Sequence, residues 1–508
     1  MPPPKQKTSR YWPIAAPYPH FMSFAPLDVW WRLLFRSPAA IPPRFWARLS
    51  LALVLSLFFT ILTLPERLLT GLWLRLRRSP RRPIPGPVII LGYYRSGTTL
   101  LQYVLGCDSN LYAPNYAQAF APQGYWFSWM LLRWFILPFM PRTRPGDNVG
   151  FGLLVPAEDD FALNNWGLAS TLPGRLVLPQ AHRFFDRFHD LSKLTTAERV
   201  RWEYCQKAFV RKLATLAGSR RILLKTPAHT GRIPALLNLY ADTTGPKFIY
   251  ISRNPHKVFR SNVTMLQRWS RIYGLQAPLA AQELQNYLLE EYLATEREYQ
   301  RTRTLIPAGS LVEIRLEDLQ ADPLGTLRRV YAELGLSFTP ALEEKVIAYL
   351  NRNRDYQLNA HPPWSPAEQE KVDAALKPLV EQGRHDRPAI ARVPLPAPKP
   401  TVRRHEIVRA VARGLVAALV CMAAGAGLAR VHIRDWLWPC GVAIGASVLR
   451  GASNQGSTRL GAYALGLTLA VTAGRLVFFY SGLHMSTSGL LLTGLALFAA
   501  YRIGSQQV

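Results

Sequence analysis

Val88-Ile-Ile-Leu-Gly-Tyr-Tyr-Arg-Ser-Gly-Thr-Thr-Leu-Leu-Gln102 is an apolar run, a short polar loop and an amphipathic run in direct succession. This order predicts a buried strand, an anion-binding loop and a helix, as at the start of a P-loop-like α/β domain. Gly92 and Gly97 have the spacing of the glycines in a nucleoside-triphosphate loop, but Thr98 stands where the phosphate-binding lysine is required. We therefore expect a smaller anionic group, held by Arg95, by backbone N–H groups and by the helix N-terminus.

The alternation of strand and helix continues after this stretch. The further runs expected to form strands are residues 221–224, 247–251 and 311–315. A helical pattern follows each run, which predicts right-handed crossovers and a parallel sheet covered by helices on both faces, a three-layer arrangement. Ligands of such sheets bind at the carboxyl ends of the strands, where Arg95, Lys225 and Arg253 are expected to lie.

A second motif accompanies the loop. The expected strand Lys247-Phe-Ile-Tyr-Ile-Ser-Arg253 ends in an arginine, and Ser261 follows eight positions later on the next helix. Together with Arg-Ser-Gly-Thr-Thr-Leu-Leu, this pair resembles the sulfotransferases that use 3′-phosphoadenosine 5′-phosphosulfate (PAPS), especially their Golgi-type and bacterial branch. The resemblance covers about residues 86–360 and implies a sulfotransferase fold with PAPS as co-substrate and no metal.

The resemblance also implies roles for individual residues. The loop residues Arg95, Ser96, Gly97, Thr98 and Thr99 would bind the 5′-phosphate and the sulfate oxygens. Arg253 and Ser261 would bind the 3′-phosphate. Lys225, in Leu224-Lys-Thr-Pro227, is similar to the family lysine near the transferring sulfuryl group and would stabilise charge on the bridging oxygen.

The general base has two candidates. Relatives supply a glutamate soon after the loop helix, but Gln118 stands in the corresponding stretch. Glu158, the first residue of Glu158-Asp159-Asp160, resembles the acidic segment of one sulfotransferase branch, and His229 follows Lys225 by four residues. Leu316 replaces the tyrosine that the family usually has in its last strand–helix segment. The sequence leaves both Glu158 and His229 open as catalytic residues.

Composition indicates a membrane protein rather than a nucleic-acid-binding one. The 508 residues carry a formal net charge of +29, and the arginines flank long apolar runs, which favours an anionic membrane surface. No nucleic-acid-binding motif is visible. The four cysteines have neither disulfide-framework nor zinc-site spacing.

We expect five parts along the chain. They are an irregular basic, proline-rich arm (1–48), a membrane-associated or transmembrane helix with a basic flank (49–82), the sulfotransferase domain (83–390), a proline- and arginine-rich linker (391–413) and about four transmembrane helices (414–508). The apolar run before Pro65 is shorter than the ~20 residues of a spanning helix. It can span with its flanks, re-enter the bilayer, or lie in the interface.

The basic residues on both sides of the α/β domain place it on the cytoplasmic face, as in a bacterial inner membrane, with a Golgi-lumenal location as the alternative. The sequon Asn262-Val-Thr264 on the expected donor-binding helix mildly favours the cytoplasm, because a glycan there would block the 3′-phosphate site.

The resemblance implies an acceptor hydroxyl, which we expect on a glycan, a lipid or a lipid-linked molecule. The aromatic segment 125–140 could dip into the bilayer surface and deliver a lipid, or it could be a packing helix. Two alternatives are a catalytically silent nucleotide-binding membrane protein and a P-loop nucleotide kinase. The kinase would need the lysine that Thr98 replaces.

Overall fold

The computed structural model describes residues 20–38, 40–76, 85–130, 152–353, 364–381 and 393–396. The chain divides into two compact units, residues 1–124 with 156–397, and residues 125–155 with 398–508. The account below concerns the first unit. The predicted helices of 414–508, the linker apart from 393–396, and most of the aromatic segment 125–140 lie outside the described residues.

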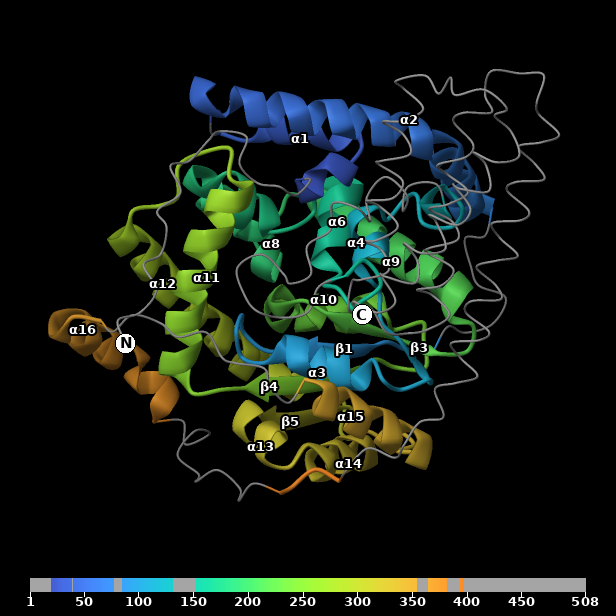
Figure 1. The fold of residues 1–508 in the computed structure, drawn as a ribbon, viewed down its shortest axis with the longest axis vertical. Helices are drawn as coiled ribbons and strands as arrows, with labels where there is room; N and C mark the ends of the chain where they lie inside the picture. Colours follow the sequence, from blue (N-terminus) through green and yellow to red (C-terminus); the bar gives the residue numbers. More distant parts are fainter. Residues whose placement is uncertain are drawn as a thin grey trace, which may run out of the picture. The chain divides into compact units, whose positions relative to one another are not determined.

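A five-stranded parallel sheet forms the centre of the first unit (Figure 1). Its strands are β1 (Val88–Leu91), β2 (Leu111–Tyr112), β3 (Arg221–Lys225), β4 (Lys247–Ser252) and β5 (Leu311–Arg315), in the order β2-β3-β1-β4-β5. Every neighbouring pair is parallel. The four strands expected from the sequence are therefore confirmed. β2 has only two residues, too few for a recognisable pattern.

Helices cover both faces of the sheet, which explains why β1, β3 and β4 carry runs of buried apolar residues. On one face, α3 (Thr98–Leu105), α13 (Leu316–Ala321), α14 (Pro323–Glu333) and α15 (Pro340–Arg352) enclose the main hydrophobic core with side chains from β1, β3, β4 and β5. On the other face lie α9 (Thr196–Ala217), α10 (Ile233–Leu239) and α12 (Ala281–Thr302) (Figure 1). The rings of Tyr250 on β4 and Tyr299 on α12 stack there at 3.8 Å. The three-layer prediction is thus confirmed.

The remaining elements connect or extend these layers. They are η1 (Phe21–Phe24), α1 (Leu27–Arg36), η2 (Pro43–Phe45), α2 (Trp46–Leu76), α4 (Tyr116–Phe120), α6 (Asp160–Gly167), η4 (Pro173–Val177), η5 (Pro179–Ala181), α7 (His182–Phe185), α8 (Arg187–Asp190), η6 (Pro227–Gly231), α11 (Pro255–Tyr273), η7 (Arg303–Leu305) and α16 (Pro366–Val380). Asn254 begins α11 directly after β4, because its side chain accepts the Lys257 N–H and Pro255 occupies the first helical position.

The N-terminal region differs from its prediction. The sequence analysis predicts an irregular arm for residues 1–48, but η1, α1 and the start of α2 lie within it. α1 buries Val29, Trp30 and Leu33 on one face, and the Trp30 indole N–H donates to the Met22 carbonyl at 2.9 Å. This amphipathic stretch is only ten residues long. Such a short pattern among prolines is a weak helix signal, and tertiary packing supplies most of the stability of short helices.

α2 is one continuous helix through Pro65, whereas the sequence shows an interruption there. A proline removes a single backbone hydrogen bond, and contacts on both sides can hold the helix together. Residues Ala52, Ser56, Phe59, Thr63, Glu66, Thr70 and Leu74 are buried, each three or four positions after the last. This spacing places them on one face of the helix along most of its length.

Candidate active site

The loop between β1 and α3 has the backbone of an anion-binding turn. Gly92 and Gly97 have φ values of 139° and 101°, and Arg95 between them has φ of 70°. The φ of Gly97 favours glycine, and a methyl group there would lie 2.6 Å from the Leu316 Cδ1 atom, so that the Leu316 side chain would have to shift. The Ser96 hydroxyl donates to the Tyr93 carbonyl at 2.8 Å and thereby braces the turn. The first N–H groups of α3 have no acceptor within the helix and are available to an anion.

The two motifs identified in the sequence meet at this loop. The Arg95 Nε atom donates to the Ser261 hydroxyl at 2.9 Å. The Arg253 guanidinium donates to the Arg95 carbonyl at 3.1 Å. Ser261 is on the second turn of α11, and Arg253 lies between β4 and α11. Three side chains expected to bind opposite ends of one donor therefore belong to one connected group.

Lys225 and Glu158 form an ion pair at the same edge of the sheet. The Lys225 Nζ atom, at the end of β3, lies 2.6 Å from a Glu158 carboxylate oxygen and 3.3 Å from the Thr99 hydroxyl. The Lys225 side chain is 1% exposed and that of Glu158 is 17% exposed. Because Thr99 is the second residue of α3, this pair adjoins the anion-binding loop. The structure therefore brings Lys225 and Glu158, two of the predicted site residues, together beside the loop.

His229, the other candidate base, is placed differently. Its Nε2 atom lies 2.8 Å from Asp159, and both side chains are fully buried. The Gln206 amide also donates to Asp159, at 3.3 Å. Burial alone would raise the pKa of Asp159, but the nearby His229 and the two hydrogen bonds outweigh it and lower the pKa. His229 is thus part of a buried polar contact that connects η6 with the start of α6.

The third acidic residue, Asp160, is also paired. The Arg232 guanidinium donates to it at 3.0 Å, and the Ser170 hydroxyl donates to its second oxygen. Glu158, Asp159 and Asp160 therefore contact Lys225, His229 and Arg232 in matching chain order. Among the three, Glu158 is the one whose partner adjoins the loop.

Gln118, which stands where relatives have a glutamate, has a structural position. The Gln118 backbone N–H donates to the Asn115 side chain, and the Gln118 side-chain oxygen Oε1 accepts the Asn115 backbone N–H, both at 3.0 Å. This is a capping box at the start of α4. The side-chain amide donates to the Tyr112 hydroxyl at 2.6 Å. The Asn-x-x-Gln spacing in the sequence could have indicated this role.

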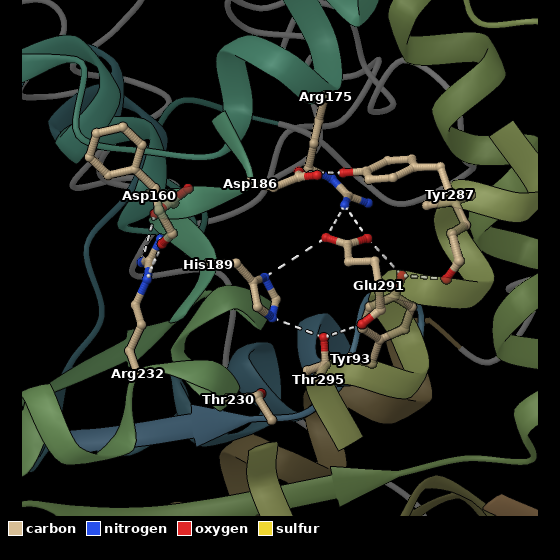
Figure 2. A network of polar contacts seen from close by, with 12 residues as sticks. Tyr93, Asp160, Arg175, Asp186, His189, Thr230, Arg232, Tyr287, Glu291 and Thr295 are labelled. Atoms are coloured by element: carbon tan, nitrogen blue, oxygen red, sulfur yellow. Dashed lines mark hydrogen bonds and ion pairs between the residues drawn. The ribbon is translucent and has the colours of Figure 1, made fainter. Parts of the chain in front are cut away.

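A buried polar network contacts Tyr93 and Tyr94 of the loop (Figure 2). The Arg175 guanidinium lies 2.5 and 2.6 Å from the two carboxylate oxygens of Glu291, and the Tyr93 hydroxyl donates to the same carboxylate at 2.8 Å. The Asn262 amide, next to Ser261, donates to the Tyr93 hydroxyl at 3.2 Å. Arg175 also lies 3.8 Å above the ring of Tyr94. Both loop tyrosines are therefore held by groups that the sequence analysis did not identify.

The network has an unusual protonation pattern. Burial disfavours the Glu291 carboxylate, but Arg175 and His189 outweigh it and lower its pKa. Burial, followed by the negative charge of Glu291, raises the pKa of Asp186 to about 7. Burial lowers the pKa of His189, whose Nε2 atom lies 2.9 Å from the Thr295 hydroxyl. Arg175 and Glu291 have no local sequence signal, because they are 116 positions apart.

Within the described ranges, no group of three or more His, Cys, Asp or Glu side chains is arranged to hold a metal ion.

Comparison with known proteins identifies the class. The model of the sulfotransferase family matches residues 87–340, half of the 508-residue chain, and this protein belongs to that family. It is a sulfotransferase with the α/β fold of that family. The matched segment contains the loop, Glu158, Lys225 and the Arg253–Ser261 pair.

The chain is similar to omega-hydroxy-beta-dihydromenaquinone-9 sulfotransferase Stf3 of Mycobacterium bovis and of Mycobacterium tuberculosis. Each is 29% identical over 339 residues, which cover 66% of this chain and 83% of the relative. Two solved structures share the fold, sulfotransferase STF9 from Mycobacterium avium (TM-score 0.52, 17% identity, 72% of this chain and 97% of that one) and sulfotransferase STF1 from M. tuberculosis H37Rv (TM-score 0.50, 16% identity, 70% and 92%).

Proposed function

We propose that this protein transfers the sulfuryl group of PAPS to the hydroxyl group of a membrane lipid. The contact of Arg95 with Ser261 and of Arg253 with the Arg95 carbonyl carries the donor assignment, because it joins the two phosphate-binding motifs. The lipid acceptor is supported by the name of the Stf3 relatives, a sulfotransferase of a hydroxylated menaquinone derivative. A glycan acceptor has no comparable support.

The residues at the sheet edge fit the donor. Arg95, the N–H groups of Gly97, Thr98 and Thr99, and the N-terminus of α3 would hold the 5′-phosphate and sulfate oxygens. Arg253 and the Ser261 hydroxyl would hold the 3′-phosphate. Ser96 would contribute by shaping the turn, because its hydroxyl donates within the loop. Arginine and backbone N–H groups are suitable partners for these oxygens, and the left-handed backbone of the loop brings the N–H groups close to an anion.

We assign the general base to Glu158. In the reaction, the acceptor oxygen attacks sulfur, the bond from sulfur to the bridging oxygen breaks, and the acceptor proton moves to the Glu158 carboxylate. The Lys225 ammonium, 2.6 Å from that carboxylate, would neutralise the charge that develops on the bridging oxygen. His229 is fully buried and bound to Asp159, so we assign it a structural role.

The location follows from charge. We place the catalytic unit on the cytoplasmic face of a membrane, attached by residues 49–82 and by about four spanning helices within 414–508, because arginine-rich segments lie beside both. The fully buried Asn262 side chain donates to Tyr93, and a glycan added to it during synthesis would prevent that contact. This supports the cytoplasm over the Golgi lumen.

Calorimetry and turnover test the proposal together. We expect 3′-phosphoadenosine 5′-phosphate to bind far more tightly than ATP. Arg253→Ala should weaken the binding of 3′-phosphoadenosine 5′-phosphate ~10- to 100-fold, because it removes one charge-assisted hydrogen bond. Arg271→Ala removes the same charge from the far end of α11 and serves as the matched control. Equal affinity for ATP, insensitive to Arg253→Ala, would contradict the donor assignment.

Turnover is measured with radiolabelled PAPS and either membrane lipid extracts or soluble sugars. We expect label in the lipid fraction. Transfer only to sugars would refute the lipid acceptor, and tight binding with no transfer to either would indicate a catalytically silent module.

A further inference from the structure

The outer face of α2 is apolar along the whole helix. Trp46 and ten large aliphatic or aromatic side chains that follow it are more than 40% exposed, namely Leu51, Val54, Leu57, Phe58, Ile61, Leu64, Leu68, Leu69, Leu72 and Leu76. Residues Pro43–Leu76 form the one helix of the described ranges that is long and apolar enough to cross a membrane. An exposed apolar surface of this extent marks a contact with a partner or a bilayer.

The inner face of α2 is fastened to the catalytic unit by polar contacts. Glu66 pairs with Lys212 of α9 at 2.9 Å, and both side chains are fully buried. Near the first turn of α2, Arg48 donates to the Gly274 carbonyl at 2.6 Å. Further along the first half of the helix, the Ser56 hydroxyl donates to the Ala25 carbonyl at 2.5 Å. The contacts thus extend from the start of the helix to its second half.

This attachment is incompatible with a helix that crosses the bilayer. A spanning α2 would place the Glu66–Lys212 pair and the adjoining part of the catalytic unit inside hydrocarbon, where charged and polar groups are expensive. Breaking the contacts to release α2 would leave Lys212 buried without Glu66. A helix lying flat in the interface keeps every inner contact and still covers its outer face.

We infer that α2 lies parallel to the membrane plane, with its outer face among the acyl chains of an anionic phospholipid bilayer. α1 packs beside α2 (Figure 1) and carries two further exposed aromatic side chains, Trp31 and Phe35. Trp rings favour the boundary between headgroups and acyl chains.

The positive charge near α2 favours an anionic lipid. Arg44 and Arg75, near the two ends of α2, are exposed, and four further arginines follow within residues 77–82 of a chain with a formal net charge of +29. Arginines at both ends of an interfacial helix lie at the level of the phosphate groups, where they attract anionic lipids. This inference depends on neither the donor nor the acceptor assigned above.

Depth measurements on the full-length protein test the orientation. In a variant whose native cysteines are replaced by alanine, Leu51→Cys, Ile61→Cys and Leu72→Cys each receive a fluorophore on the outer face. The proteins are reconstituted into phosphatidylcholine–phosphatidylglycerol vesicles that contain a nitroxide quencher at a shallow or a deep acyl position. We expect all three labels to be quenched to a similar extent, and more strongly by the shallow nitroxide.

Two outcomes would overturn the inference. Deep quenching at Ile61 with shallow quenching at Leu51 and Leu72 would mean that α2 spans the bilayer. Absence of quenching at all three would mean that protein, such as the 414–508 segment, covers this face. A label at Ala341→Cys on α15, which packs on the sheet face away from α9, is the unquenched control.

Discussion

Glu158→Gln and His229→Gln separate the two candidate bases, because the structure predicts opposite effects for them. Glu158→Gln removes the proton acceptor. General-base catalysis contributes ~10²- to 10⁴-fold, so we expect kcat to fall by this factor, about 2.7–5.5 kcal/mol in the activation free energy. The glutamine oxygen can still accept from Lys225, which lies 2.6 Å away, and Glu158 is partly exposed, so stability should change by only about 1 kcal/mol.

His229→Gln should have the reverse effect. His229 and Asp159 are both fully buried and 2.8 Å apart. Weakening this buried contact leaves the Asp159 carboxylate poorly compensated, which costs up to about 3–5 kcal/mol in the free energy of unfolding. The folded fraction should keep kcat within about threefold of the wild type, because His229 does not touch the reacting atoms in our assignment.

The assay combines initial rates of sulfuryl transfer at saturating PAPS with thermal unfolding. Active enzyme is counted by titration with 3′-phosphoadenosine 5′-phosphate, so that misfolded protein does not count as lost kcat. A 100-fold lower kcat in His229→Gln together with nearly unchanged kcat in Glu158→Gln would refute the reasoning and assign the base to His229.

Three further predictions concern the loop, the N-terminal region and α2. Gly97→Ala places a methyl 2.6 Å from Leu316 Cδ1 at a φ of 101°, so we expect about 1–3 kcal/mol of destabilisation and weaker binding of 3′-phosphoadenosine 5′-phosphate by calorimetry; unchanged affinity would count against the loop assignment. Burial lowers the pKa of His20 to about 4 from 6.5, so the unfolded chain binds this proton more readily and stability falls as pH drops from 6.5 towards 4. In denaturant titrations, His20→Gln should remove up to about 3 kcal/mol of that pH dependence, and an unaltered pH profile would contradict it. Lys212→Met leaves the Glu66 carboxylate buried without its partner and should cost about 3–5 kcal/mol in unfolding experiments, whereas adding Glu66→Leu should recover most of it; no recovery would argue against the buried pair.

Local sequence patterns predicted most of the sheet. The apolar run at Val88–Leu91 and the runs that became β3, β4 and β5 are long enough to show a strand between turn residues. Local patterns gave no correct prediction where the signal was short or mixed. β2 has two residues, and α1 lies within a proline-rich region. In both places contacts with residues far along the chain, such as the bond from the Leu27 N–H to the Thr60 hydroxyl and the β2–β3 pairing, decide the conformation.

The residues of the candidate site also fall into those that the sequence predicts and those that it does not. The loop and the Arg253–Ser261 pair are recognisable because each motif is contiguous or nearly so, and its glycines and arginine have local reasons to be there. The network of Arg175, Glu291 and Tyr93 has no such signature. Its members come from separate elements and acquire their roles only through burial beside one another.

The sequence by itself determined the class of fold and the candidate anion-binding loop, because strand periodicity and an anion-binding turn depend on residues close together in the chain. Only the tertiary structure showed that Glu158 and His229 have different surroundings, since each contacts a partner about 70 positions away: 67 for Glu158 with Lys225 and 70 for His229 with Asp159. The tertiary structure also decided which face of α2 contacts the protein and which is exposed. The composition of α2 alone would suit a spanning helix equally well. Glu66 looks costly in an apolar helix until Lys212, 146 positions later, is placed beside it, and that long-range contact turns one face towards protein and the other towards lipid.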